Sequence, residues 1–161
     1  MESIVFRSAR IADADAVWAV RTEAIVRGCS SHYPKNIIDS WSAAAMPEGY
    51  GAMLQREGFI LAMEGYRVVG FAGLKAAARE VNAVFVHPEV AGQGLGAQLL
   101  ERVESQARSL GLRAVMLHAS LNALAFYGRY GYVELGRGFH STRSGLQIAC
   151  IHMEKQLDSA A

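Results

Sequence analysis

Three glycines within five positions, between an apolar run and a helical pattern, constrain this chain more than any other feature. The stretch VFVHPEVAGQGLGAQLL runs from Val84 to Leu100 and contains Gly92, Gly94 and Gly96. Because glycine weakens helices and strands, this concentration indicates a tight turn or a backbone that a ligand must approach closely. The first N–H groups of a helix lack internal partners and carry about half a positive charge, so a strand, a glycine turn and a helix in this order predict an anion site.

Phosphate suits such a turn, because successive N–H groups hold it with little help from side chains. The turn itself contains no lysine or arginine, and a Cβ atom at Gly94 or Gly96 would stand in the way of the phosphate oxygens. Two alternatives remain at this point: a turn without a ligand, and the G-x-G-x-x-A fingerprint of dinucleotide-binding domains. That fingerprint belongs to the first strand–helix unit of its domain, whereas this turn lies in the middle of the chain.

The composition fits a folded protein with an apolar core. The chain has 161 residues, of which 52% are apolar and 19% charged, and its formal net charge is +1. It has no basic cluster, so we expect no nucleic-acid partner, and no apolar run of ~20 residues, so we expect no membrane partner. Cys29 and Cys150 lie far apart and share no metal-ligand spacing with the histidines, which predicts two buried thiols and no metal site. Charges near the N-terminus interrupt any signal-peptide core, so a cytoplasmic protein is expected.

Periodicity and turn residues predict both strands and helices in a single domain that covers residues 1–161. The predicted strands cover residues 3–9, 59–64, 67–74, 81–87, 113–119, 132–137 and 146–155, and the predicted helices cover 14–28, 34–44, 95–110 and 120–131. Residues 46–51 and 138–145 are expected to form loops. Asp13 is expected to cap the first helix, and Glu104 and Arg108 to pair on the polar face of the third. This order predicts an α+β fold with helices on a mixed sheet.

A second pattern, SLNALAFYGRYGY, completes the first. Together with VHPEVAGQGLG it resembles the GNAT acyltransferase superfamily, the enzymes that move an acetyl group from acetyl-CoA to an amine. The family signatures look like V-x-P-x-x-[R/Q]-G-x-G-x-G on a strand, turn and helix, and like N-x-x-A-x-x-F-Y-x-x-x-G-F further on. Here they occupy residues 86–96 and 122–132. The N-terminal FRSARIADADAV also looks like the family's first strand and helix, so the resemblance covers nearly the whole chain.

The resemblance implies a GNAT-like fold, with a mixed, mostly antiparallel central sheet, helices on both faces, and fourth and fifth strands that splay apart. The pantetheine arm of acetyl-CoA would lie in that gap, and its pyrophosphate would bind the N–H groups of the glycine turn. The implied cofactor-binding residues are Val84, Phe85, Val86, Gly92, Gln93, Gly94, Leu95, Gly96, Ala97, Asn122 and Tyr127. The family usually carries Arg or Gln where this chain has Ala91, which predicts weaker cofactor binding. It also keeps open an alternative, a CoA-binding sensor module without turnover.

The same resemblance identifies Tyr127 as the proton donor to the departing thiolate. A phenol has a pKa near 10, so it stays protonated at neutral pH and can donate as charge develops on sulfur. Glu80, at the start of the fourth strand, is the predicted base and would act through water. His118, on the far side of the gap, is the alternative, because imidazole is a suitable base near neutral pH. A backbone N–H near Val84 or Phe85 would donate to the oxygen of the transferred carbonyl.

The first two helices and the last strand pair form the acceptor side in this family. That implies residues 27–41 and 138–145. Individual candidates are Cys29, His32, Tyr33 and Trp41, whereas His87, His140 and His152 are expected on the surface or in loops. The acceptor stays open between a small-molecule amine and a protein amine. A homodimer is compatible with the resemblance, since dimers are common among such folds.

Overall fold

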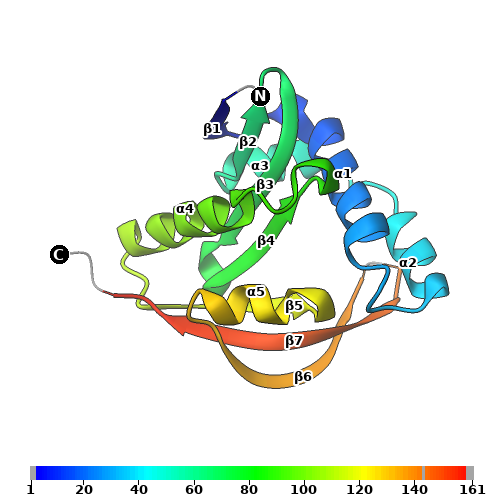
Figure 1. Ribbon diagram of the computed structural model, residues 1–161. Helices are drawn as coiled ribbons and strands as arrows, with labels where there is room; N and C mark the ends of the chain where they lie inside the picture. Colours follow the sequence, from blue (N-terminus) through cyan, green and yellow to red (C-terminus); the bar gives the residue numbers. More distant parts are fainter. Residues whose placement is uncertain (1–2, 143, 159–161) are drawn as a thin grey trace.

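The computed structural model describes residues 3–142 and 144–158. Within them, seven strands form one sheet in the order β1-β2-β3-β4-β5-β7-β6 (Figure 1). The strands are β1 (Ile4–Ser8), β2 (Ile60–Glu64), β3 (Arg67–Lys75), β4 (Glu80–Val86), β5 (Ala114–Ser120), β6 (Val133–Ser141) and β7 (Gln147–Gln156). Neighbouring strands are antiparallel, except for the parallel pair β4 and β5. The predicted mixed, mostly antiparallel sheet is confirmed, and the mostly parallel sheet of a dinucleotide-binding domain is excluded.

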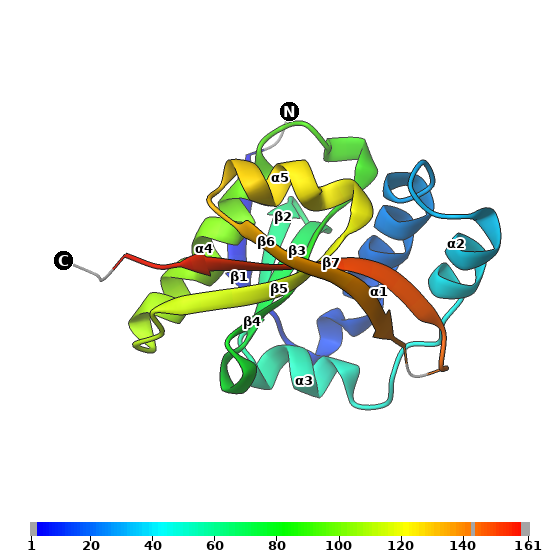
Figure 2. The same cartoon turned by 90° about the horizontal axis from the view of Figure 1, so that it is seen from below.

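Helices cover both faces of this sheet, as predicted. They are α1 (Ala14–Glu23), α2 (Lys35–Ser42), α3 (Tyr50–Arg56), α4 (Leu95–Ser109) and α5 (Leu124–Arg129). Short helical turns flank them: η1 (Ile11–Asp13), η2 (Ala24–Gly28), η3 (Ala76–Ala78), η4 (Pro88–Val90) and η5 (Leu121–Ala123). Seen from below, α4 and α5 lie on one side of the strands, and α1, α2 and α3 lie on the other (Figure 2). None of the helices in the described ranges is both long and apolar enough to cross a membrane.

The apolar stripes of α1 and α4 hold these helices on opposite faces of the sheet. Leu95, Leu99 and Val103 of α4 are buried, at the helical spacing that the sequence shows. Val17 and Val20 of α1 are buried in a second cluster with residues of α3, β2 and β3. Each such side chain contributes about 1.5–3 kcal/mol when it is removed from water. The two clusters together fix β3 and β4 between α1 and α4.

The strands β4 and β5 meet at one point and then diverge. Their only register pair among the described residues is Glu80 with Met116, where the Met116 N–H donates to the Arg79 carbonyl at 2.9 Å. β4 stays paired with β3 up to Val86, so its other edge, residues 81–86, has no strand partner in the described part of the chain. Figure 1 shows β4 and β5 forming a V that opens toward α1 and α2. The predicted splay is therefore present.

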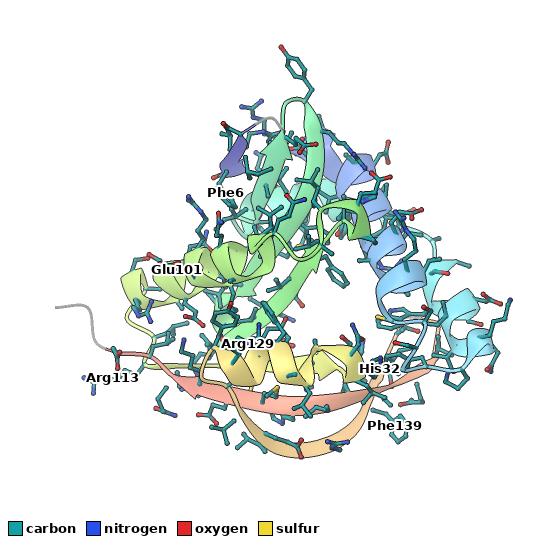
Figure 3. The ribbon with its side chains drawn as sticks, viewed as in Figure 1. Phe6, His32, Glu101, Arg113, Arg129 and Phe139 are labelled. Carbon is teal, nitrogen blue, oxygen red and sulfur yellow. The ribbon has the colours of Figure 1, made fainter. Side chains whose placement is uncertain are left out.

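The far half of α4 is fixed to β7 by a buried carboxylate. Glu104 is 4% exposed, and it accepts hydrogen bonds from the Tyr132 hydroxyl at 2.8 Å and from Lys155 Nζ at 2.9 Å. The predicted ion pair with Arg108 is confirmed, with Arg108 Nη2 3.9 Å from Glu104 Oε1. Glu104 is nevertheless buried rather than on an exposed polar face, because these partners satisfy the carboxylate inside the protein. Glu101, three residues earlier on α4, is exposed (Figure 3).

Three local predictions also differ from the structure. The sequence predicted a loop at residues 46–51 and no helix following it. In the structure α3 begins inside that loop, at Tyr50, directly after Gly49 in a left-handed conformation (φ 72°). Asp13 is the N-cap residue of α1, as predicted, but its side chain forms no capping hydrogen bond with that helix; it accepts instead from the Arg7 guanidinium at 2.8 Å and from the Arg10 N–H at 2.7 Å. β6 continues to Ser141, into the predicted loop 138–145, because its backbone pairs with β7 up to Gln147. Arg143, within that predicted loop, lies outside the described residues.

Candidate active site

A cavity of about 520 Å³ opens where β4 and β5 diverge. This size is typical of small-molecule sites. Its described lining residues are Ala24, Arg27, Gly28, Cys29, Tyr33, Trp41, Val81, Asn82, Ala83, Val84, Phe85, Val86, Pro88, Ala91, Leu117, His118, Ser120, Asn122, Ala123, Tyr127, His140, Ile148, Ala149 and Cys150. Segments far apart in the sequence thus share one space: the β4 edge, the end of β5 with η5 and α5, the η2–α2 segment, and β7.

The glycine turn lies at the start of α4 and has unused N–H groups. Gly92 and Gly94 adopt φ angles of 80° and 81°, which strongly favour glycine. Gly94 is the N-cap residue of α4, and no side chain caps this helix end. Within the described residues, the N–H groups of residues 92–97 donate no hydrogen bond. An added Cβ at Gly92 or Gly94 would meet no atom within 4 Å. The turn therefore combines free donors, open space and the positive end of a helix.

The structure gives a different reason for glycine at position 96 from the one that the sequence suggested. A Cβ atom there would lie 3.2 Å from Cζ of Phe126 and 3.8 Å from a methyl group of Val86. Glycine at this position lets α4 approach α5 and β4 closely, whereas the open space of the turn lies at Gly92 and Gly94. This packing joins the two sequence motifs, since Phe126 belongs to the second.

The second motif brings Tyr127 to the cavity. Tyr127 is 8% exposed, and its ring makes edge contacts with Phe126 at 5.1 Å and with Tyr132 at 5.5 Å between centroids. Burial raises its pKa, so the hydroxyl keeps its proton at neutral pH. In the described residues, no group forms a hydrogen bond with this hydroxyl. Tyr127 therefore has a proton to donate and no protein acceptor for it.

The predicted β4 residues and Asn122 also lie at the cavity. Val84, Phe85 and Val86 line it, and Phe85 stacks on Phe71 of β3 at 5.2 Å. Asn122 lines it from within η5; the N-cap of α5 is Ala123, so Asn122 does not cap that helix. Residues 92–97 do not line the cavity, but they directly follow Ala91, which does. The glycine turn therefore begins at the edge of the cavity.

Both candidate bases from the sequence meet at the point of the V. His118 Nδ1 lies 3.3 Å from Glu80 Oε1, across the β4–β5 contact. His118 lines the cavity, whereas Glu80 does not. The two side chains are 43% and 23% exposed, so water reaches the pair. Glu80 therefore contacts the imidazole of His118 at the cavity wall, and of the two side chains His118 is the one that lines the cavity.

One of the remaining histidines is placed differently from the prediction. The His152 ring stacks on that of His118 at 5.0 Å, and its Nε2 is buried without a partner in the described structure. His140 belongs to β6 and is exposed, which agrees with the prediction of a surface residue, and it also lines the cavity; its pKa is lowered by desolvation and by the nearby charge of His118. His87 precedes η4 and accepts from the Glu89 N–H, which agrees with the prediction of a loop residue. The β7 residues were missed, although the alternation in QIACIHM could have placed Ile148, Cys150 and His152 on one face.

The acceptor-side candidates are brought together except for His32. Cys29, Tyr33 and Trp41 line the cavity, with the Tyr33 and Trp41 rings 5.5 Å apart. His32 is exposed and does not line it; it lies near α2, at the end of the molecule where Phe139 also lies (Figure 3). The buried Arg21 donates to the Trp41 carbonyl at 2.8 Å, which ties α1 to the end of α2.

Tyr33 connects the helical wall to the sheet. Its hydroxyl donates to the Ala149 carbonyl at 2.6 Å and accepts from the Leu121 N–H at 3.0 Å. Its pKa is raised, mainly by burial. Because both hydrogen-bonding functions of this hydroxyl are used, Tyr33 presents its ring rather than a polar group to the cavity.

The two thiols are buried, as predicted, and are poor nucleophiles. Burial raises the pKa of Cys29 to about 11 and also raises that of Cys150. Thiolate rather than thiol attacks carbonyl carbon, so neither group is activated at neutral pH. Direct transfer to an acceptor therefore suits this cavity better than an acyl-cysteine route. In the described part of the chain, no three His, Cys, Asp or Glu side chains converge to hold a metal ion.

Comparison with known sequences agrees with this geometry. Residues 29–157 match the model of the acetyltransferase (GNAT) domain. A mycothiol acetyltransferase of Streptomyces bingchenggensis is 30% identical over 139 residues, which cover 81% of this chain and 43% of that protein. An IAA acetyltransferase of Azospirillum brasilense is 37% identical over 60 residues, which cover 35% of this chain and 39% of that protein. The chain thus spans about two fifths of the length of the curated relatives it matches.

Solved structures share the fold over almost the whole chain. A GCN5-related N-acetyltransferase from Rhodopseudomonas palustris has a TM-score of 0.88 and 28% identity, with 98% of each chain covered. The PaiA N-acetyltransferase from Thermoplasma acidophilum, solved in complex with coenzyme A, has a TM-score of 0.72 and 23% identity, with 96% of this chain and 99% of that one covered. The splayed sheet, the two motifs and these matches lead to one conclusion: the chain belongs to the GNAT acetyltransferase family, a family of acyltransferase enzymes.

Proposed function

We propose that this protein is an acetyl-CoA-dependent N-acetyltransferase that transfers the acetyl group directly to an amine. The observation that carries the proposal is one cavity with three features in it and beside it. The unpaired edge of β4 and the protonated Tyr127 line the cavity, and the N–H groups of residues 92–97, free in the described structure, follow directly on the lining residue Ala91. A turn that binds no ligand would not require these three features to lie next to one another.

The chain's groups fit the parts of acetyl-CoA. The N–H groups of residues 92–97 would hold the diphosphate, because they are free donors at a helix start with open space beside Gly92 and Gly94. The open β4 edge, including residues 84–86, would hold the amide groups of the pantetheine arm, since strand edges bind extended amide chains. Ala91 adds neither a charge nor a hydrogen bond beside the diphosphate, so affinity rests on the backbone donors. Acetyl-CoA, when bound, supplies the acetyl group as a reactive thioester.

Tyr127 is the proposed acid. Its raised pKa keeps the hydroxyl protonated, and no protein group competes for its proton in the described residues. It gives this proton to the sulfur as the carbon–sulfur bond breaks. The N–H of Val84 or Phe85 would donate to the carbonyl oxygen during the same step.

His118 is the proposed base, and Glu80 is its positioning residue. Glu80 accepts from Nδ1 of His118, which leaves Nε2 as the atom that can take a proton. His118 takes the proton that the nitrogen loses as its bond to the acetyl carbon forms. Partial exposure of both side chains lets water carry the proton onward.

One experiment separates this function from the CoA-binding sensor, which the alanine at position 91 favours. Thiol release is measured with acetyl-CoA and a panel of amines, and thermal stabilisation is measured with CoA alone. Amine-dependent thiol release together with stabilisation by CoA supports the transferase. Stabilisation by CoA with no thiol released from any amine would support the sensor instead.

A further inference from the structure

The acceptor end of the cavity carries no carboxylate. None of its lining residues in the described part of the chain is Asp or Glu. Three glutamates beside lining residues are already engaged: Glu80 contacts His118 at 3.3 Å, Glu23 contacts Arg27 at 3.2 Å, and Glu89 contacts Arg67 at 2.6 Å. None of these glutamates lines the cavity. An amine with several ammonium groups needs negative charge in its binding site, so this wall does not suit a polyamine or an aminoglycoside.

The same wall offers apolar surface instead. The rings of Tyr33 and Trp41 contact each other at its helical side, and Phe85 faces them from β4 within the same cluster of packed residues. The Tyr33 hydroxyl is used by the Ala149 carbonyl and the Leu121 N–H. Burial keeps the Cys29 thiol neutral. The groups that could meet a ligand body here are thus rings and an uncharged sulfur.

Arg27 is the one lining residue with a permanent charge among those described. Its Nε lies 3.2 Å from Glu23 Oε2, and its side chain is 46% exposed. Its two terminal nitrogens form no hydrogen bond within residues 3–142 and 144–158. A guanidinium with free terminal donors matches a carboxylate, which it can bind through two parallel hydrogen bonds.

We propose that the acceptor is the α-amino group of a free apolar amino acid, with its carboxylate at Arg27 and its side chain against Tyr33 and Trp41. This proposal rests on the proposed transferase function and names its substrate class. A single amine then faces His118, the one charge of opposite sign meets Arg27, and the apolar body fills the rest. Each part of such a molecule has a partner of matching chemistry in this cavity.

Thiol release with three amines tests the substrate class. The amines are L-phenylalanine, L-phenylalaninamide, which lacks only the carboxylate, and spermidine. We expect kcat/KM for phenylalanine to exceed that for each of the others at least about tenfold, as for one charge-assisted contact. Arg27→Gln should reduce the ratio of phenylalanine to its amide to less than about twofold. Arg56→Gln, an exposed arginine of α3 outside the cavity, is the matched control and should keep the ratio.

The outcomes separate this proposal from the transferase function. A higher kcat/KM for spermidine, or an unchanged ratio in Arg27→Gln, overturns the amino-acid proposal while acetyl transfer stands. If no amine releases thiol, calorimetric binding to the CoA-loaded protein decides the acceptor class. Binding of phenylalanine that Arg27→Gln abolishes and Arg56→Gln preserves supports the proposal. No binding of phenylalanine, or equal binding of spermidine, overturns it.

Discussion

In the described part of the chain, polar groups are hydrogen-bonded within the protein toward one end of α4 and lack protein partners at the other. At the C-terminal end, the buried carboxylate of Glu104 receives hydrogen bonds from Tyr132 and Lys155, and β7 is held against the helix. At the N-terminal end, residues 92–97 leave their N–H groups without partners in the described structure. Both ends also contain left-handed glycines, Gly94 with φ 81° and Gly111 with φ 79°. Similar backbone geometry thus occurs at both ends of α4, although among the described residues the nearby polar groups are paired at one end and unpaired at the other.

The difference shows which end contributes stability and which end can bind. Unpaired donors cost little where water reaches them, and they are available to a ligand. A paired buried carboxylate contributes to the fold but has no capacity left for a ligand. The same contrast exists in the sheet, where β4 and β5 pair at Glu80 and diverge beyond it. We therefore expect substitutions at the two ends to separate binding from stability.

The largest effect is expected for Gly94→Val. Valine cannot adopt φ 81° without strain, so the turn must change and its N–H groups must point elsewhere. CoA binding, followed by calorimetry, should fall by more than about a hundredfold, or ~2.7 kcal/mol. Gly111→Val is the matched control, because it introduces the same strain at the other end of α4, also with no atom within 4 Å of the new Cβ. The Gly111→Val protein should be destabilised to a similar degree as the Gly94→Val protein, yet keep its affinity for CoA. Equal CoA affinity in the two variants would show that the two ends of α4 do not differ in CoA binding.

Glu104→Gln should do the reverse. It leaves the Lys155 ammonium without its carboxylate, so the free energy of unfolding should fall by about 2–3 kcal/mol. Urea denaturation measures this, with Glu101→Gln as the exposed control, for which a change within about 0.5 kcal/mol is expected. CoA affinity should stay within about twofold of the native value. A stability loss that is no larger than in the Glu101 variant would show that the buried network contributes little.

Tyr127→Phe should lower kcat at least about tenfold, or ~1.4 kcal/mol of activation free energy. The phenyl ring preserves the packing against Phe126 and Tyr132, so CoA affinity and stability should change little. Tyr130→Phe, at the C-cap of the same short helix and in contact with Phe126 but outside the cavity, is the control. An unchanged rate in the Tyr127 variant would remove this residue from the mechanism.

The smallest effect concerns Cys29 and pH. Its pKa rises from 9.0 to about 11 by burial, so the folded state holds the thiol proton more tightly than the unfolded state. The resulting stabilisation is fully present below pH 9 and is lost as the pH rises through 11. Alkylation at pH 8 should therefore be slow in the folded protein and fast in urea, as followed by mass spectrometry. Rapid alkylation of Cys29 in the folded state would reopen a nucleophilic role.

Local patterns in the sequence predicted the parts of the fold that depend on neighbours in the chain. The strands predicted at residues 59–64 and 67–74 follow from two apolar runs separated by two residues, and β2 and β3 confirm them as an antiparallel pair. α3 was missed because it has only seven residues and begins after a glycine without a side-chain cap. The burial of Glu104 could not be predicted, because Tyr132 and Lys155 lie 28 and 51 residues further along the chain.

The predictions for the candidate site show the same division between local motifs and long-range contacts. The glycine turn and Tyr127 were found from motifs, since each motif occupies one continuous stretch. The contact between Glu80 and His118 joins residues 38 positions apart, so only the splayed geometry of β4 and β5 reveals it. The packing of Gly96 on Phe126 likewise depends on how α4 and α5 meet. Sequence identified the residue types, and the fold decided which of them touch.

The central claim is that the N–H groups at the start of α4 bind the diphosphate of CoA. Titration of the ¹⁵N-labelled protein with CoA, followed by amide resonances, tests this at both ends of the helix at once. We expect the resonances of residues 92–97 to shift downfield and saturate with the binding curve, while those of residues 108–112 stay in place. Saturating CoA binding that leaves the amides of residues 92–97 unshifted would contradict the account.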